Sequence, residues 1–308
     1  MTKVGIIGAG YMADHHLKVL TAIKSVDVTS ICSRTIDSAS KMSKKWGIER
    51  VFKDHVQMIE SGKVEAVFIC APVSAMFDIT RDVLERGIPC LIEKPVGLSA
   101  GEASVLAKIA RGNNTKTAVG CNRRFISTIQ EAKKAANDLG GLRHLTVVAH
   151  EPIEEIASTG QYSDSVMSRW IFANGIHCID LIRYFVGDVD EVSSMSENQN
   201  YAAVLKSGNA TVSYTSRSDA KGRWSVTLDC RKGRVTLCPL EKTVIEADNK
   251  TNVVGLSEID QEFKPGLWHQ NNSFLKFLES SSFKASDFGL SDIHDNFKTM
   301  KVIDKIVS

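Results

Sequence analysis

The feature that most constrains the fold lies at the start of the chain, where a short apolar run breaks into a glycine-rich turn. Residues 4–7 are followed at once by Gly8-Ala9-Gly10-Tyr11-Met12-Ala13, and a pattern typical of an amphipathic helix comes next. In such a unit the first glycine allows a tight turn and the second leaves room for a phosphate near the backbone. The helix N-terminus adds free N–H groups and the positive end of its dipole. Because strand, turn and helix agree, the sequence predicts a dinucleotide-binding unit.

Apolar runs and helix-like patterns alternate through the first 121 residues of the chain. The runs lie at residues 26–32, 51–52, 64–70, 89–92 and 116–120. Apolar residues recur at helical spacing over residues 36–46, and Asp54 is expected to cap the short helix that follows residues 51–52. The run at 64–70 is almost continuously apolar, as expected of a central parallel strand covered on both faces. Because a 308-residue chain is too long for one typical core, we expect two domains, residues 1–121 and 122–308. The first is predicted to be an α/β domain with a doubly wound parallel sheet of the Rossmann type.

The second domain has a different pattern. Residues 201–206 and 210–216 flank one turn, and residues 224–230 and 235–237 flank another. Two successive hairpins predict an antiparallel sheet and hence an α+β domain. One face of these strands carries Val212, Tyr214, Trp224, Val226 and Leu228. Because an apolar face of this kind needs a cover, we expect a homo-oligomer, a dimer or tetramer, through this sheet. Residues 151–169 are expected to be irregular and long enough to act as a lid.

Composition argues against several classes of partner. The chain has 38 basic and 36 acidic residues and no basic run interleaved with aromatic residues, so we expect no nucleic-acid partner and no membrane surface. No segment approaches the length of a membrane span, and the first strand leaves no room for a signal peptide, so we expect a cytoplasmic protein. The seven cysteines include no Cys-x-x-Cys pair. They predict reduced, buried thiols and no metal site.

The residues after the second strand bear on the choice of nicotinamide cofactor. Proteins that bind NAD place an Asp or Glu there, against the ribose 2′-hydroxyl. This chain has Ser33, Arg34 and Thr35 instead. A carboxylate would repel a 2′-phosphate, whereas an arginine fork and two hydroxyl groups can hold one. The pattern favours NADP(H). NAD(H) stays open, since Arg34 can equally be a solvated residue at a helix start.

Two further strand ends are expected to line the cofactor. Ala71 and Pro72 follow the run at 64–70, on the side where open α/β sheets bind ligands. The next strand ends in Glu93-Lys94-Pro95. A lysine at the carboxyl end of a buried strand is placed for proton transfer. The alternative is a surface lysine before a rigid turn.

Four motifs together resemble one known family. The sequence Gly-x-Gly-x-x-Ala follows the first strand, Glu93-Lys94-Pro95 the fifth, and Gly120-x-Asn122-Arg123-Arg124-Phe125 the sixth. The sequence Gly175-Ile176-His177-x-x-Asp180 comes later. Their order and spacing resemble the glucose-fructose oxidoreductase / inositol dehydrogenase (Gfo/Idh/MocA) family over essentially the whole chain. The resemblance implies an N-terminal Rossmann domain and a C-terminal α/β domain, whose large open sheet covers the nicotinamide and commonly makes subunit contacts.

The resemblance also implies roles for individual residues. It places Lys94 and His177 near the substrate carbon whose hydride goes to the nicotinamide, with His177 as the general base and Lys94 stabilising the alkoxide. From the motifs together, the residues expected to bind the cofactor are Gly8, Gly10, Tyr11, Met12, Ser33, Arg34, Thr35, Ala71, Pro72, Glu93, Lys94 and Asn122. Those expected to bind substrate are Lys94, Arg124, Asn174, His177 and Asp180.

The chain departs from the family pattern just before His177. The family usually has an Asp four residues before this histidine, whereas this chain has Ala173 with Asn174 beside it. Alanine cannot orient a proton-transfer network, and asparagine can hydrogen-bond but cannot carry charge. Asn174 is also predicted to cap the helix that carries His177 in its first turn, where the helix dipole favours a neutral imidazole. The alternative for His177 is an ordinary buried histidine.

The leading prediction is an oxidoreductase, preferring NADP(H), that acts on a hydroxyl of a carbohydrate-like small molecule: a sugar, a sugar nucleotide or a cyclitol. A non-catalytic NAD(P)-binding regulator of the same fold is an alternative that Ala173 favours. Lys94 and His177, retained together, oppose it. A third possibility is a glycosidase or lyase that uses tightly held NAD in a transient oxidation.

Overall fold

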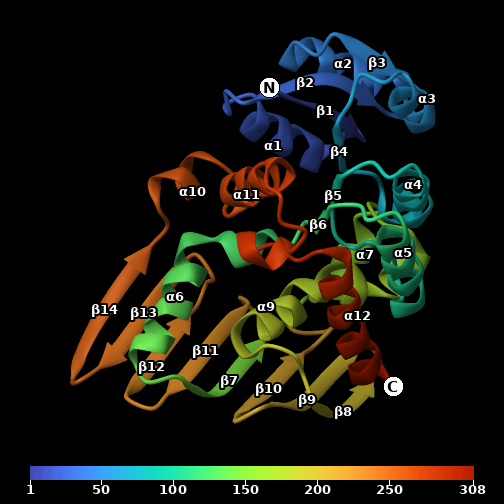
Figure 1. The fold of residues 1–308 in the computed structure, drawn as a ribbon. Helices are drawn as coiled ribbons and strands as arrows, with labels where there is room; N and C mark the ends of the chain where they lie inside the picture. Colours follow the sequence, from blue (N-terminus) through green and yellow to red (C-terminus); the bar gives the residue numbers. More distant parts are fainter. The chain divides into compact units, whose positions relative to one another are not determined.

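The computed structural model describes residues 1–308 (Figure 1). By its internal contacts the chain divides into two compact units. The first contains residues 1–122 and 267–297, and the second contains residues 123–266 and 298–308. Residues 267–297 fall in the C-terminal domain expected from the sequence, but they make their contacts with the first unit. Each unit therefore contains a segment from the end of the chain.

The first unit is built on a six-stranded parallel sheet with the strand order β3-β2-β1-β4-β5-β6. This is the order of a doubly wound sheet, so the predicted Rossmann domain is confirmed. The strands are β1 (Thr2–Ile7), β2 (Val26–Cys32), β3 (Arg50–Phe52), β4 (Ala66–Ile69), β5 (Cys90–Ile92) and β6 (Thr117–Val119). The helices are α1 (Tyr11–Leu20), α2 (Ile36–Trp46), α3 (His55–Glu60), α4 (Val73–Glu85), α5 (Ala100–Gly112) and α11 (Leu267–Glu279), with the short η3 (Ala285–Phe288).

Local sequence explains several of these boundaries. All of β4 is buried, as expected for a central strand covered on both faces. Asp54 accepts a hydrogen bond from the backbone N–H of Gln57 and caps α3, as predicted. Ser99 caps α5 by accepting from the N–H of Glu102. Each cap satisfies an N–H that the first turn of a helix leaves unpaired, so these helix starts are fixed by nearby residues.

The second unit is built on an eight-stranded sheet with the order β14-β13-β12-β11-β7-β10-β9-β8. Its strands are β7 (Leu142–Val148), β8 (Glu191–Glu197), β9 (Asn200–Ser207), β10 (Ala210–Ser216), β11 (Ser225–Cys230), β12 (Gly233–Leu237), β13 (Lys242–Ala247) and β14 (Lys250–Gly255). Neighbouring strands are antiparallel except β7 and β10, which run parallel. The predicted large, mostly antiparallel sheet is confirmed, and its two predicted hairpins are β9–β10 and β11–β12.

Helices of the second unit lie over one face of this sheet (Figure 1). Helix α6 (Ser127–Asp138) contacts β12, β13 and β14, and α9 (Ile176–Val186) contacts β7. The last helix, α12 (Ile293–Val307), ends beside β8, where Ser194 and Ser196 donate hydrogen bonds to its final carbonyl groups. The remaining short elements are η1 (Asn122–Phe125), α7 (Ile153–Ser158), α8 (Asp164–Met167), the π-helix η2 (Ile171–Gly175) and α10 (Glu258–Glu262). Residues 151–169, expected to be irregular, therefore contain two short helices.

The two faces of the eight-stranded sheet differ in chemistry. On one face Leu205, Val212, Leu145, Leu228 and Val235 form a fully buried row across five neighbouring strands. On the opposite face one register row crosses all eight strands and consists of Ser193, Val204, Ser213, Thr146, Thr227, Thr236, Val244 and Val253. We call this face, defined by that second row, the open face.

The expectation of an oligomer rested on an apolar strand face that needs a cover, and the buried row shows that this reason is wrong. Val212, Tyr214, Val226 and Leu228 are each at most 1% exposed within the single chain. A second copy is not needed to cover them, because the helices on that face of the sheet already do so.

The expectation of buried thiols is wrong for Cys238, which is exposed. None of the helices has the length and apolar character needed to cross a membrane.

Candidate functional site

The carboxyl ends of the first unit's strands lie in one register row. Pairing aligns Cys32, Ile7, Ile69, Ile92 and Val119, each the last residue of its strand. We call this alignment the strand-end row. The backbone N–H that follows each strand bonds the last carbonyl of its neighbour: Gly8 N to Cys32 O at 2.7 Å, Cys70 N to Ile7 O at 2.7 Å, Glu93 N to Ile69 O at 2.9 Å and Gly120 N to Ile92 O at 2.8 Å. The loops after these strands therefore leave the sheet along one edge.

The glycine turn at this edge has the shape that a dinucleotide phosphate requires. Gly8 has φ +110°, and a Cβ there would collide with the carbonyl oxygen of Cys70. Gly10 precedes α1, and a Cβ built on it would meet no atom within 4 Å, so the space above it is open. No side chain caps α1. The turn and the helix N-terminus fit a pyrophosphate, with Tyr11 and Met12 in the first helical turn and Ala13 buried beneath.

The loop after β2 carries Ser33, Arg34 and Thr35. Arg34 and Thr35 are exposed, and the Ser33 hydroxyl accepts a hydrogen bond from the backbone N–H of Thr35 at 3.3 Å. Asp54 lies close to this loop, which its place in the sequence did not reveal. Burial raises the pKa of the Cys32 thiol to about 12, and the charge of Asp54 adds to that rise. Asp54 comes to this place because β3 pairs with β2 and ends beside Cys32.

The other predicted cofactor residues also follow strand ends. Ala71 is half-buried, and the exposed Pro72 precedes the first residue of α4. Asn122 is half-buried and begins η1, just beyond β6. These residues, with the glycine turn, Ser33 and Lys94, belong to the first unit and border its strand-end row.

Glu93 is held by a buried histidine. Its Oε1 lies 3.0 Å from Nε2 of His16, and Nδ1 of His16 lies 3.1 Å from Oδ1 of Asn271. Glu93 is 5% exposed and His16 is fully buried. A Cβ on Gly120 would lie 2.9 Å from the Glu93 carboxylate, so glycine there leaves space for it. Half-buried Lys94 follows this network directly in the chain and precedes a cis peptide bond to Pro95. His16 and Asn271 were missed, because contacts across such sequence separations leave no local pattern.

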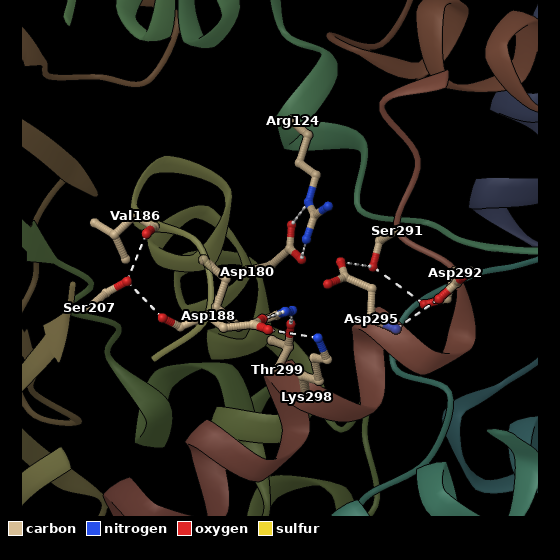
Figure 2. Close-up of polar contacts among 11 residues, drawn as sticks. Arg124, Asp180, Val186, Asp188, Ser207, Ser291, Asp292, Asp295, Lys298 and Thr299 are labelled. Carbon is tan, nitrogen blue, oxygen red and sulfur yellow. Dashed lines mark hydrogen bonds and ion pairs between the residues drawn. The ribbon is translucent and has the colours of Figure 1, made fainter. Parts of the chain in front are cut away.

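In the second unit, Arg124 and Asp180 form a bidentate pair (Figure 2). Nε of Arg124 donates to Oδ2 of Asp180 at 2.7 Å, and Nη2 donates to Oδ1 at 2.6 Å. Both residues are buried. The pair joins η1 to α9, the helix that carries His177. The guanidinium also lies 5.9 Å from the ring of Tyr184, one turn further along α9.

His177 is 8% exposed and lies in an aromatic and cationic environment. Its ring centroid is 6.4 Å from that of Trp224, and the guanidinium of Arg123 stacks 4.1 Å from the Trp224 ring. Burial lowers the pKa of Arg123, while Cys178, Glu241 and Glu151 act in the opposite direction. Burial raises the pKa of the Cys178 thiol to about 12, so this neighbour of His177 is neutral near pH 7.

Asn174 is not a helix cap, and that prediction is wrong. It lies inside the π-helix η2, which runs directly into α9, and Gly175 has helical φ and ψ angles. Its side-chain Nδ2 donates to Oε1 of Glu151 at 2.6 Å. His177 is consequently not at a free helix N-terminus, and the argument that a helix dipole keeps its imidazole neutral fails with it.

A cavity of about 220 Å³ lies near the C-terminal end of α9. Four basic side chains and one carboxylate contribute to its lining: Arg183, Lys298, Lys301, Lys305 and Asp188. Asp188 accepts hydrogen bonds from Arg183 and Lys298 at 2.6 Å each, and these lower its pKa (Figure 2). Two turns of helix separate this cavity from His177 along α9. No group of three or more His, Cys, Asp and Glu side chains is arranged to hold a metal ion.

Two family models match the chain. Residues 2–121 match the model of an oxidoreductase family with an NAD-binding Rossmann fold, and residues 129–255 match the GFO/IDH/MocA C-terminal domain. The rhizopine catabolism protein MocA of Rhizobium meliloti is 27% identical over 60% of this chain and 57% of its own length. D-apiose dehydrogenase of Paraburkholderia graminis is 23% identical over 83% of this chain and 67% of its own length.

Solved structures agree on the architecture. A dehydrogenase from Chromobacterium violaceum superposes with a TM-score of 0.85 at 19% identity, covering 99% of this chain and 94% of that one. At this identity the likeness establishes the fold. Together the two family models span every strand of both sheets. The chain therefore belongs to the Gfo/Idh/MocA family of oxidoreductases.

Proposed function

We propose that the chain is an NAD(P)-dependent dehydrogenase or reductase that transfers a hydride between the nicotinamide and a hydroxyl or keto carbon of a sugar, sugar nucleotide or cyclitol. The observation that carries the proposal is the strand-end row, which places the glycine turn after β1 and Lys94 after β5 on one edge of the sheet. The sugar named in D-apiose dehydrogenase supports a carbohydrate-like substrate. The relatives do not favour a non-catalytic regulator, a glycosidase or a lyase.

The cofactor would be held by the chain's own backbone at the glycine turn. The open space at Gly10 and the N-terminus of α1 suit the pyrophosphate, and a bound nicotinamide supplies the carbon that accepts or donates the hydride. We propose that NADP(H) is preferred. Exposed Arg34 offers a guanidinium fork to a 2′-phosphate, with hydroxyls at Ser33 and Thr35 beside it.

In this proposal Lys94 and His177 carry out the proton chemistry. When an alcohol is oxidised, its carbon loses a hydride and its hydroxyl loses a proton. His177 accepts that proton at its imidazole, and the Lys94 ammonium stabilises the oxygen as negative charge develops on it. In the direction of reduction the same groups return the proton. Arg124, Asn174 and Asp180 complete the proposed substrate residues, and the Arg124–Asp180 pair holds α9 to η1.

A homo-oligomer, dimer or tetramer, remains part of the proposal, now through the open face of the eight-stranded sheet. Val204 and Val253 on that face are 58% and 54% exposed, and their neighbours in the row are serine, threonine and valine. Such small side chains allow close approach of a second flat sheet. Light scattering that gives the mass of one chain at micromolar concentration would contradict this assembly.

The proposed activity is tested by screening sugars, sugar nucleotides and cyclitols for cofactor reduction, with NAD and NADP in parallel. Each positive substrate is repeated with Lys94→Met and with the control Lys108→Met, which changes an exposed lysine on α5. We expect turnover in the parent and the control and a large loss in Lys94→Met. Turnover that survives Lys94→Met unchanged would come from another protein or another site. A cofactor-bound protein with no turnover on any member of these classes would overturn the proposal.

A further inference from the structure

The cavity near the end of α9 is lined by cations from two helices. Arg183 lies in the last turn of α9, and Lys298, Lys301 and Lys305 come from α12. The three lysines are spaced by three and four positions, so they share one face of α12. Against these four cations the lining contains one acid, Asp188, so three positive charges are in excess. All of the lining residues belong to the second unit.

Asp188 shows how an anion is held at this place. Its Oδ1 accepts from Nη2 of Arg183 at 2.6 Å, and its Oδ2 accepts from Nζ of Lys298 at 2.6 Å (Figure 2). Arg183 is 6% exposed, and its Nη1 donates to the hydroxyl of Thr299 at 2.9 Å. A guanidinium fixed in this way is already oriented for an oxyanion, because its planar fork matches the oxygens of a carboxylate or a phosphate.

The row of lysines on α12 is not explained by the helix dipole. A cation in the last turn of a helix offsets the partial negative charge of that end, and this effect falls off within one turn. Lys305 is the basic residue of the last turn of α12. Lys298 and Lys301 lie earlier in the helix, yet they line the same cavity. Their common feature is therefore the cavity and not the helix end.

The acids that are close in sequence do not balance the lining. Asp190 accepts from the backbone N–H of Gly208 at 2.9 Å, and Glu191 pairs with Lys206 at 3.3 Å. Asp304 belongs to α12, but neither it nor the other two acids line the cavity. The cavity thus presents more positive than negative charge to whatever enters it.

We propose that this cavity is a binding site for a phosphate group, supplied by inorganic phosphate or by a small phosphate monoester. A monoester phosphate carries about −1.5 to −2 charges near pH 7, and its oxygens can accept from several cations at once. The volume of about 220 Å³ far exceeds the roughly 30 Å³ that one water molecule occupies. None of the cations has to be without another partner, since an ammonium has three N–H donors and a guanidinium five.

The site is separate from the proposed dinucleotide site, which the first unit forms at its glycine turn. It is therefore tested without cofactor or substrate. Isothermal titration calorimetry of the whole protein uses inorganic phosphate and methyl phosphate, with chloride at matched ionic strength as the negative probe. A tighter binding of methyl phosphate would assign the site to a phosphorylated metabolite, and a tighter binding of inorganic phosphate would assign it to the free ion.

Charge variants locate the binding. Lys305→Glu and Lys298→Gln should each weaken phosphate binding about tenfold or more, the loss expected for a hydrogen bond to a charged group. The matched control is Lys242→Glu, an exposed lysine on β13. That strand lies toward the end of the sheet opposite to β8, the strand beside α12. This control changes the net charge as Lys305→Glu does and should leave the affinity unchanged.

One variant should act in the opposite direction. Asp188→Asn keeps the size of the side chain but removes the charge that competes for Arg183 and Lys298. We expect it to tighten phosphate binding about tenfold, by the same hydrogen-bond energies. Damage to the fold would instead weaken binding, so the sign of the change separates the two explanations.

The glycine turn could also bind phosphate, and a further variant distinguishes the two places. Gly10→Asp puts a carboxylate into the open space at the turn and should leave the proposed binding unchanged. Phosphate binding that is lost in Gly10→Asp and kept in Lys305→Glu would overturn the inference. So would an equal loss in Lys242→Glu and Lys305→Glu, an Asp188→Asn variant that binds more weakly, or no binding at about 10 mM phosphate, where a site with a Kd of 1 mM would be mostly filled.

Discussion

Glu93 and Glu151 are both held by hydrogen bonds from other segments of their own units, but their partners differ in chemistry. Glu93, in the first unit, is buried against His16, whose imidazole is an ionisable partner. Glu151, in the second unit, is half-buried and accepts from an indole and an amide, which cannot ionise. The first carboxylate is thus enclosed within its unit, whereas the second lies closer to solvent.

The difference in burial sets how much each contact contributes to stability. Removing one partner of a buried hydrogen bond leaves the other partner unsatisfied where water does not reach it, whereas a half-buried group can still bond to water. We therefore expect changes at Glu93 to reduce stability more than changes at Glu151.

The largest effects are expected at the two proposed catalytic side chains. Lys94→Met and His177→Ala should each lower kcat by a factor on the order of 10² to 10⁴, since each removes a group that acts on the proton or the oxygen in the transition state. The double variant should lose much less than the product of the two single losses, because groups that act together are not additive. Steady-state kinetics on the substrate found by screening measures this.

The same variants test whether the cofactor site is independent of His177. Fluorescence titration should give a nearly unchanged NADPH affinity for His177→Ala, because the glycine turn holds the pyrophosphate. Near-parental turnover in His177→Ala would remove the proposed proton-transfer role. A strictly multiplicative loss in the double variant would mean that the two residues act on separate steps.

The second prediction compares the carboxylates through stability. Leaving a buried hydrogen-bonding group without its partner typically costs about 1–3 kcal/mol, and more for a charged group, so Glu93→Gln and His16→Ala should each lower the free energy of unfolding by about 3 kcal/mol. Glu151→Gln should cost less, about 1–2 kcal/mol, since it disturbs one hydrogen bond of a half-buried group. Chemical denaturation with Glu60→Gln as an exposed control gives the ranking. An equal cost at both positions would abolish the distinction drawn here.

The third prediction concerns the exposed loop after β2. Arg34→Ala should weaken NADPH binding about tenfold, the loss expected for a hydrogen bond to a charged phosphate, and should leave NADH binding unchanged. Parallel titrations with both cofactors, in the parent and the variant, measure the preference. Equal affinities in the parent, or no loss of NADPH affinity in the variant, would contradict a preference for NADP(H). The next residue to substitute would then be Asp54, the acidic residue near this loop.

The smallest effect is expected at the thiols. Burial raises the pKa of Cys32 in one unit and of Cys178 in the other to about 12, whereas Cys238 is exposed. Thiolates and not thiols react with iodoacetamide, so brief treatment of the native protein should label Cys238 and spare the other two. Peptide mass spectrometry reads the sites. Rapid labelling of Cys178 would show that the region around His177 opens to solvent.

Sequence alone predicted the features that follow from local pattern. The bounds of β2 and α2, the cap at Asp54 and the two hairpins agree with the structure, because periodicity, caps and turns are set by neighbouring residues. The cofactor residues were also assigned from local pattern. In a doubly wound sheet the carboxyl ends of the parallel strands lie at one edge, so the residues that follow each strand are expected to come together there.

The supports of the candidate site could not be predicted in this way. His16 meets Glu93 across 77 positions and Glu151 meets Asn174 across 23, so neither contact leaves a periodic signal. Asn174 was taken for a cap because it has a capping side chain before an apolar run, while the structure continues the helix through it. The apolar strand face was assigned to a second copy, because sequence does not show that α6 and α9 return to cover it.

The π-helix between Trp170 and α9 acts like a one-residue insertion in an otherwise continuous helix. Trp170 and Asn174 are four positions apart, and both reach one carboxylate across this wide turn. Deleting a single residue, Phe172 or Ala173, would leave them three positions apart on one face of a regular α-helix, where both side chains can still be presented to a common partner. The wide turn thus absorbs one residue of chain length while the helix stays continuous from Trp170 to His177.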